Sequence, residues 1–230
     1  MTKSYDVWWQ KGQESDDDMA CDHQEAWERT IEMLDTSDIK GKTILDVGCN
    51  QGGFLRKLYD TTPFKEGVGI DLARLSLEKA ETLKGERPLT YYLTDKPQET
   101  NRTFDTAVST SVLYLIEDIP QHAQDLKEVL KPGGVYYASF ADLTNNPSRQ
   151  FMDDTINQYG ATPSQNHSLK HIVDSFVDAG FEVAVMKEPV PVVIDLTHYS
   201  DFYLSPNDYL QTLYEESFLI KASVKEGIGK

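Results

Sequence analysis

A glycine-rich turn between an apolar run and an amphipathic stretch is the feature that most constrains this chain. Residues 44–54 read ILDVGCNQGGF, which predicts a buried strand, a tight turn and the first turn of a helix. Gly48, Gly52 and Gly53 carry no Cβ, so backbone N–H groups at the start of the helix can approach a ligand closely. The turn therefore predicts a binding site at the carboxyl end of this strand.

The rest of the chain supplies the sheet that such a turn needs. From Lys42 onward, short apolar runs alternate with amphipathic stretches, a pattern typical of a parallel sheet covered by helices. We predict strands at residues 43–47, 67–70, 89–93, 104–109, 134–140, 181–186 and 218–224, and helices at 52–59, 73–83, 119–130 and 169–179. The chain then divides into an N-terminal helical cap segment, residues 1–40, and an α/β domain, residues 41–230, with long insertions at 141–168 and 187–217.

An acid lies at the end of the second predicted strand. Residues 66–71 read EGVGID, and Asp71 follows Gly48 by 23 residues, where an acid accepts hydrogen bonds from both hydroxyls of a ribose. A dinucleotide and a nucleoside without a pyrophosphate both fit this arrangement. The dinucleotide motif has a glycine where this chain has Asn50, whose side chain would intrude on a phosphate. An NAD(P)-dependent oxidoreductase is therefore the less favoured alternative.

Four motifs in sequence carry a family resemblance. They are LDVGCNQG at residues 45–52, GID at 69–71, FDTAV at 104–108 and LKPGG at 130–134. Together they resemble the class I S-adenosylmethionine-dependent methyltransferases, from residue 42 to 141 and more loosely to 224. The resemblance implies a Rossmann-like, doubly wound, seven-stranded and mostly parallel sheet whose last strand is antiparallel. It also implies an enzyme that uses S-adenosylmethionine and releases S-adenosylhomocysteine.

The same resemblance implies which residues bind the cofactor. In the family, the first strand tip and its turn face the methionine part, the acid of the second strand holds the ribose with the next residue on adenine, and an acid after the third strand accepts from the adenine amino group. By this resemblance, the methionine part faces Asp46, Gly48, Cys49 and Asn50. Asp71 holds the ribose, Leu72 packs on adenine, and Asp95 accepts from the adenine amino group. Lys96 follows Asp95 where an apolar residue is usual. The remaining predicted cofactor-binding residues are Gly52, Lys96, Ser109 and Thr110.

The methyl acceptor is expected beyond the tip of the fourth strand and near the two insertions. A free amine or thiolate needs only alignment for attack, whereas a hydroxyl acceptor needs a base. The candidates for such a base are His198, His167, His122 and Asp142, and no sequence feature selects among them. Tyr114 is a further candidate for a catalytic residue. The predicted acceptor-binding residues are Tyr114, Asp142, Tyr199, Phe202 and Tyr203.

The charge of the chain narrows its expected partners. It has 38 Asp and Glu residues against 22 Lys and Arg residues, a formal net charge of −16 over 230 residues. A phosphate backbone needs a basic footprint, so we expect a neutral or cationic small-molecule acceptor and neither nucleic acid nor membrane as a partner. The two cysteines form no metal or disulfide pattern, so no metal is expected. No secretory signal is apparent, which predicts a cytoplasmic protein. We expect a monomer or a homodimer.

The N-terminal segment combines large aromatic side chains with acidic residues. Tyr5, Trp8 and Trp9 precede a run of three aspartates, which is typical of a solvated loop or a helix N-cap. We expect the aromatic residues to close over the cofactor, as N-terminal helices do in many members of the resembled family. The alternative from another functional class is a non-catalytic S-adenosylmethionine-binding module or partner subunit, because fold alone does not establish catalysis.

Overall fold

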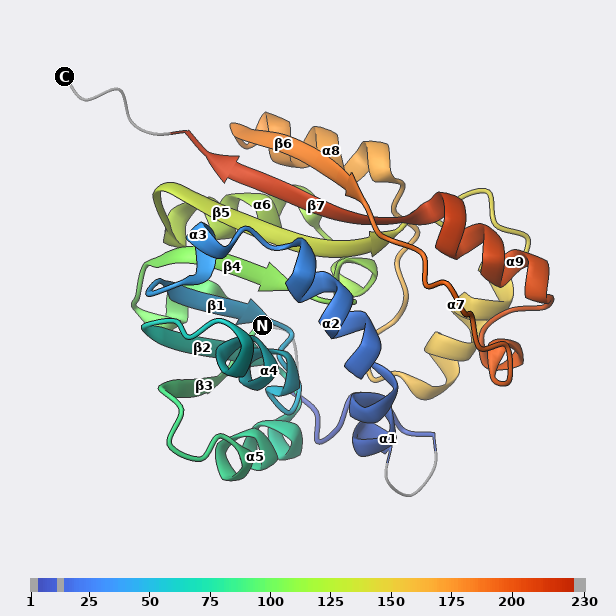
Figure 1. Ribbon diagram of the computed structural model, residues 1–230, viewed down its shortest axis with the longest axis horizontal. Helices are drawn as coiled ribbons and strands as arrows, with labels where there is room; N and C mark the ends of the chain where they lie inside the picture. The colour runs from blue at the N-terminus through green and yellow to red at the C-terminus, as the bar shows by residue number, and fades with distance from the viewer. Residues whose placement is uncertain (1–3, 12–14, 226–230) are drawn as a thin grey trace.

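The computed structural model describes residues 4–11 and 15–225 and has one seven-stranded sheet at its centre. Its strands are β1 (Thr43–Val47), β2 (Glu66–Asp71), β3 (Leu89–Leu93), β4 (Phe104–Ser109), β5 (Leu130–Ala141), β6 (Phe181–Lys187) and β7 (Ser217–Val224). They lie in the order β3-β2-β1-β4-β5-β7-β6, and β7 runs antiparallel to both of its neighbours (Figure 1). The predicted Rossmann-like methyltransferase fold with an antiparallel last strand is confirmed.

Helices surround this sheet and also fill the N-terminal segment and both long insertions. They are α1 (Ser15–Asp22), α2 (Gln24–Met33), α3 (Thr36–Ile39), α4 (Gly53–Thr61), α5 (Arg74–Leu83), α6 (Ile119–Val129), α7 (Arg149–Tyr159), α8 (Leu169–Asp178) and α9 (Pro206–Gln211). A π-helical turn, Thr212–Glu216, leads from α9 into β7. In Figure 1 the helices α7 and α9 lie together at one end of the molecule, beyond the tips of the parallel strands.

Two apolar clusters hold the helices to the sheet. One contains Ile119 and Leu126 of α6 together with Phe176 of α8. The other contains Phe54 of α4 and Ile31 of α2. Because successive side chains of a strand point to opposite faces, the buried strands feed both clusters and read as nearly continuous apolar runs. This is why sequence periodicity located the strands well.

Side-chain caps define where several helices begin. The Asp118 carboxylate accepts a hydrogen bond from Gln121 N at 2.9 Å at the start of α6. The Ser168 hydroxyl accepts from His171 N at 3.2 Å at the start of α8. Each cap satisfies a backbone N–H that has no partner within the helix. The predicted starts of these two helices therefore agree with the structure.

The order of the strands determines where a ligand can bind. The chain leaves β1 toward β2 on one side, and it returns from β3 to β4 on the other side of β1. Connections that diverge in this way open a crevice at the carboxyl ends of β1 and β4. No helix in the part of the chain that the structure describes is long and apolar enough to cross a bilayer.

Candidate functional site

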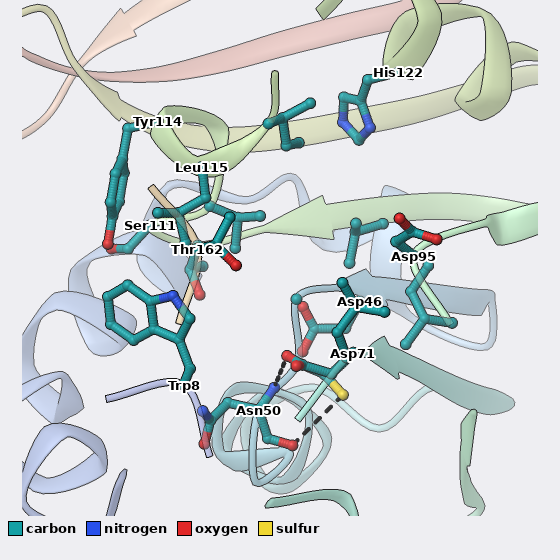
Figure 2. Close-up of a pocket in the computed structure, with 18 of the residues that line it drawn as sticks. Trp8, Asp46, Asn50, Asp71, Asp95, Ser111, Tyr114, Leu115, His122 and Thr162 are labelled. Atoms are coloured by element: carbon teal, nitrogen blue, oxygen red, sulfur yellow. Dashed lines mark hydrogen bonds between the residues drawn. The ribbon is translucent and has the colours of Figure 1, made fainter. Parts of the chain in front are cut away.

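A cavity of about 550 Å³ lies at the carboxyl ends of β1, β2 and β4 (Figure 2). Pockets for small ligands and cofactors have volumes of roughly 300 to 1,000 Å³. The predicted cofactor or acceptor residues that line it are Asp46, Gly48, Cys49, Asn50, Asp71, Leu72, Asp95, Lys96, Thr110 and Tyr114. Asp46 and Tyr114, which are 68 positions apart in the sequence, therefore line the same cavity, because parallel strands end at the same edge of the sheet.

The glycine-rich turn after β1 packs closely against Val112 and is hydrogen-bonded to Ile70 of β2. Gly48 has φ +75°, and a Cβ on it would lie 2.6 Å from a methyl carbon of Val112. The N–H groups of Gly48 and Cys49 both donate to the carbonyl oxygen of Ile70, at 2.9 and 3.1 Å. Asn50 also has positive φ, +45°, which asparagine tolerates better than most residues. The turn needs glycine at position 48 and leaves room above it for a ligand.

Asp71 ties the turn to the tip of β2. Its two carboxylate oxygens accept from Asn50 N at 2.7 Å and from Ala73 N at 2.8 Å. Burial nevertheless raises the pKa of Asp71, because desolvation outweighs these hydrogen bonds. Each carboxylate oxygen can accept more than one hydrogen bond, so Asp71 can still accept from ribose hydroxyls.

Asp46 is the most unusual acid of the cavity. Its Oδ2 atom is buried and has no hydrogen-bond partner. Burial, together with the nearby charge of Asp71, raises the pKa of Asp46 from 3.8 to about 8. A buried acceptor without a partner is costly and rare. The donor set that would satisfy it is a ligand ammonium or hydroxyl, and the amino group of S-adenosylmethionine fits this requirement.

Residues 4–11, here called the N-terminal strap, cross the cavity and are fixed on both sides of it. On one side, Tyr5 N donates to the carbonyl oxygen of Leu72 at 3.0 Å. On the other side, Ala161 N donates to the carbonyl oxygen of Trp8 at 2.9 Å. Tyr5 and Trp8 both line the cavity, so the strap forms part of its wall (Figure 2).

Asp16 of α1 binds this strap to the rest of the protein, and it was not among the predicted site residues. The carboxylate is 4% exposed and accepts from Trp9 N at 3.0 Å and from the Asn50 side-chain amide at 3.2 Å. It also accepts from the hydroxyl of Ser76 in α5. Within the run of aspartates, nothing in the sequence marks the one that is buried. The only available signal was the density of acids beside aromatic residues.

The remaining wall comes from the segment after β4 and from residues 162–165. Ser111 has φ +58°, a strained conformation for serine that is often found at functional sites. Figure 2 shows Thr162 and Tyr114 on the same side as Ser111, and burial raises the pKa of Tyr114. Gln165 also lines the cavity, and its backbone N–H donates to the carbonyl oxygen of Tyr114 at 2.7 Å. Ser111, Thr162 and Gln165 were not predicted as site residues. His122 lies at the opposite end, and burial lowers its pKa to about 4.

Two of the predicted cofactor residues stand behind the cavity wall and do not line it. Gly52, with φ +67°, lies under the turn, where a Cβ would be 2.3 Å from the hydroxyl of Tyr91. Ser109 is buried at the end of β4 and accepts from the hydroxyl of Tyr136 at 2.9 Å. Both residues shape the cavity from outside it.

The predicted acceptor residues other than Tyr114 lie away from the cavity. Asp142 accepts from Leu169 N at 2.8 Å and so supports the start of α8. The His198 side chain is 83% exposed. The residues Tyr199, Phe202 and Tyr203 belong to the second insertion and pack outside the cavity wall, where Phe202 contacts Trp9 with ring centroids 5.9 Å apart. The described residues contain no group of three or more acids, histidines or cysteines that could hold a metal.

Comparison with known proteins agrees with this geometry. Residues 45–136 match a family described as "Methyltransferase domain". A tRNA U34 carboxymethyltransferase from Hydrogenovibrio crunogenus is 34% identical over 117 residues, which are 47% of this chain and 34% of that protein. A malonyl-[acyl-carrier protein] O-methyltransferase from Anoxybacillus flavithermus is 28% identical over 45% of this chain and 40% of that protein. The matches thus cover about a third to two fifths of these relatives.

The solved structures extend the likeness to most of the chain. A methyltransferase from Haloferax volcanii, solved in complex with the activator Trm112, superimposes with a TM-score of 0.73 at 18% identity over 92% of this chain and 96% of its own. The N-methyltransferase NodS from Bradyrhizobium japonicum, in complex with S-adenosylhomocysteine, has a TM-score of 0.58 at 18% identity over 88% and 87%. At these identities the structures establish the fold.

Residues 45–136 form a methyltransferase domain, and the seven-stranded sheet has the fold of the class I S-adenosylmethionine-dependent methyltransferases. The expectation that nucleic acid is excluded as a partner is wrong, because relatives 34% identical over part of the chain are tRNA-modifying enzymes. Net charge is a sum over all residues and does not describe the surface around one site.

Proposed function

We propose that this protein transfers a methyl group from S-adenosylmethionine to a small-molecule acceptor bound between the N-terminal strap and the segment after β4. The observation that carries the proposal is the pair of buried acids at neighbouring strand tips, Asp46 with an unpaired Oδ2 and Asp71 with both oxygens directed by backbone N–H groups. The pair offers one acceptor for an ammonium group and another for ribose hydroxyls.

When bound, the cofactor supplies an activated methyl group for attack by a nucleophile. This chain's contribution is to hold the ribose with Asp71, to accept from the amino group with Asp46, and to exclude water with the strap. Alignment of this kind can contribute about 7 to 11 kcal/mol toward a two-reactant barrier. An amine acceptor that arrives unprotonated therefore requires no further catalytic residue.

The lining of the cavity favours a neutral or cationic acceptor. Lys96 is the single lysine or arginine among its described residues. The acids of the lining are Asp46, Asp71, Asp95, Glu117, Asp118 and Asp125. Uncompensated acids attract cations and repel anions most strongly in a concave, poorly hydrated site. The strap and residues 162–165 also form part of the cavity wall, and a cavity of about 550 Å³ supports a small acceptor.

A nucleoside of tRNA is the second candidate acceptor. The observation in its favour is the printed activity of the relatives, which are tRNA U34 carboxymethyltransferases. The match covers about a third of the length of these relatives, so their whole activity cannot be assigned to this chain from the match alone. A tRNA acceptor would have to present a flipped-out base to the cavity that Tyr114 lines.

Calorimetry and a transfer assay test these proposals. S-adenosylhomocysteine should bind the wild-type protein, NAD should not, and Asp71→Asn should weaken the binding of S-adenosylhomocysteine roughly 10- to 150-fold. Transfer of a labelled methyl group should then be measured with neutral and cationic amines, with hydroxyl compounds, and with unmodified tRNA. Binding of NAD without S-adenosylhomocysteine would contradict the cofactor assignment. Labelling of tRNA alone would replace the small-molecule acceptor with the second candidate.

A further inference from the structure

We propose that the indole N–H of Trp8 binds the carboxylate of the cofactor's methionine end, so that the cofactor itself fastens the N-terminal strap. The inference rests on the proposed function, because it needs a cofactor with an amino-acid end. It assigns to this chain a specificity-determining residue in a segment that lies outside the matched methyltransferase domain.

The first observation is a donor without a partner. Trp8 lines the cavity, and its Nε1 atom is buried with no hydrogen-bond acceptor. A buried indole N–H usually finds a partner, and a buried donor without one costs about 1 to 3 kcal/mol. Figure 2 shows the indole at one end of the group of lining residues, with its nitrogen on the side of Ser111 and Thr162. The missing partner is therefore expected in the cavity.

The second observation is the order of groups along the cavity. In Figure 2 Asp95 and Trp8 lie on opposite sides of Asp71. With the ribose at Asp71 and adenine toward Asp95, the amino-acid end of the cofactor extends toward Trp8. Trp8 Nε1 and Asp46 Oδ2 are both buried without partners, and one is a donor and the other an acceptor. An α-amino acid zwitterion carries the two complementary groups.

The third observation concerns the other groups of the cavity that could bind a carboxylate. Lys96, the single lysine or arginine of the described lining, is the neighbour of Asp95 at the adenine end. The N–H groups of the glycine-rich turn are also engaged. Those of Gly48 and Cys49 donate to Ile70 O, and that of Asn50 donates to Asp71. Several hydroxyl groups also line the cavity, but Trp8 Nε1 is the donor of the described lining that is buried without a partner, which makes it the suitable partner for the carboxylate.

This contact would couple ligand binding to the position of the strap. Within the described part of the chain, five backbone hydrogen bonds hold the strap, three to residues 72–75 on one side of the cavity and two to residues 159–161 on the other side. A charge-assisted hydrogen bond to a carboxylate is about twice as strong as a neutral one. A ligand with a carboxylate should therefore stabilise the closed strap, and one without it should not.

The binding experiment compares two ligands and three proteins by calorimetry. S-adenosylhomocysteine has the amino-acid end, and 5′-deoxy-5′-methylthioadenosine has the adenosine and the thioether without it. Trp8→Phe keeps an aromatic ring and removes the N–H, and it should raise the Kd for S-adenosylhomocysteine roughly 10- to 100-fold while leaving that for methylthioadenosine unchanged. Trp9→Phe is the matched control, because it also removes one indole N–H from the strap, keeps an aromatic ring stacked beside Trp8, and changes a residue that does not line the cavity. Both Kd values should stay within about twofold in that control.

A second measurement needs no variant. Lys11 ends the described strap and is exposed, so trypsin can cleave after it when the strap opens. S-adenosylhomocysteine should slow this cleavage in the wild-type protein, and saturating methylthioadenosine should not. In Trp8→Phe the protection by S-adenosylhomocysteine should be lost.

Three results would overturn the inference. An unchanged Kd for S-adenosylhomocysteine in folded Trp8→Phe would remove Trp8 from the carboxylate site. An equal loss for both ligands would assign Trp8 to the adenosine part. Equal protection of the strap by both ligands would show that the carboxylate does not fasten it. Failure of the wild-type protein to bind S-adenosylhomocysteine is a different outcome, because it would overturn the proposed function and this inference with it.

Discussion

The side-chain amide of Asn50 donates a hydrogen bond to the buried carboxylate of Asp16 at 3.2 Å. This contact links the glycine-rich turn to the N-terminal helix α1, across 34 positions of sequence. The same carboxylate accepts from Trp9 N of the strap and from Ser76 of α5. One acid therefore holds together the turn, the strap and the helix α5 that follows β2.

Asp16→Ala should destabilise the protein and weaken cofactor binding together. The change leaves three donors without their acceptor, at a cost of about 1 to 3 kcal/mol in the free energy of unfolding. Urea denaturation measures this loss, and calorimetry measures the affinity for S-adenosylhomocysteine. Asp6→Ala is the matched control, because Asp6 belongs to the strap, is 65% exposed and pairs with Arg74 on the surface. That exposed pair contributes at most about 1 kcal/mol. A larger loss for Asp6→Ala than for Asp16→Ala would contradict the fastening role of Asp16.

Asp46 should make the unliganded protein less stable as the pH rises. Its pKa is about 8 in the folded protein and 3.8 in an ordinary environment, so the folded state binds the proton more tightly than the unfolded state. The stabilising effect of protonation is complete below pH of about 4 and is lost as the pH rises to about 8. Asp46→Asn lacks this titration. The stability of Asp46→Asn relative to wild type should therefore increase between about pH 5 and pH 8 and then level off.

The same acid should release a proton when the cofactor binds. At neutral pH the unliganded Asp46 carboxyl is protonated, because its pKa is about 8. Pairing with a ligand ammonium favours the ionised form and lowers this pKa. Calorimetry with S-adenosylhomocysteine in two buffers that differ in ionisation enthalpy should detect the released proton in wild type. It should be absent in Asp46→Asn, and equal heats in both buffers for the wild-type protein would remove Asp46 from the amino-group site.

Asp142 should contribute to stability and not to cofactor binding. Its two oxygens accept from Leu169 N at 2.8 Å and from Thr144 N at 3.1 Å, which lowers the pKa of the carboxyl despite partial burial. Asp142→Ala removes an acceptor at the start of α8 and should cost about 0.5 to 2 kcal/mol. Thermal denaturation measures this cost, while the Kd for S-adenosylhomocysteine should not change. A loss of methyl transfer in a stably folded Asp142→Asn protein would restore Asp142 as a base.

The central strands were predictable from the sequence because they are buried on both faces of the sheet, as β1 and β2 are. The predicted strand at residues 89–93 agrees with β3 residue for residue, and that at 104–109 agrees with β4. Helix α7 was missed because its sequence, RQFMDDTINQY, buries only Thr155 and Ile156 and gives little apolar periodicity. Strand β5 begins earlier than predicted, at Leu130, because Leu130 already pairs with Phe104 before the register shifts.

The site was predictable only where a local motif defines it. The acids at the tips of β1 and β2 follow from the strand and turn pattern, since parallel strands end at one edge. The strap contacts depend on residues far apart in sequence. Asp16 accepts a hydrogen bond from Ser76, which is 60 positions away in the sequence, and the carbonyl oxygen of Trp8 accepts one from Ala161 N. No periodicity encodes such pairs, because they arise from tertiary packing. For the same reason, aromatic density in residues 187–217 did not reveal which cavity or surface the side chains face.

Phe202 should influence the cofactor through the strap. Its ring contacts that of Trp9 at 5.9 Å, and Trp9 in turn stacks on Trp8, which lines the cavity. Aromatic pairs of this kind contribute about 0.5 to 1.5 kcal/mol beyond their buried area, so Phe202→Ala should raise the Kd for S-adenosylhomocysteine about 2- to 12-fold. The matched control is Tyr214→Ala, since Tyr214 belongs to the same insertion and is 57% exposed. Calorimetry on both variants, with circular dichroism to confirm folding, measures the difference.

Because Phe202 acts on Trp9 and not on the ligand, Phe202→Ala should add little to the loss already caused by Trp8→Phe in the double variant. Full additivity of the two losses would show that Phe202 acts independently of the strap.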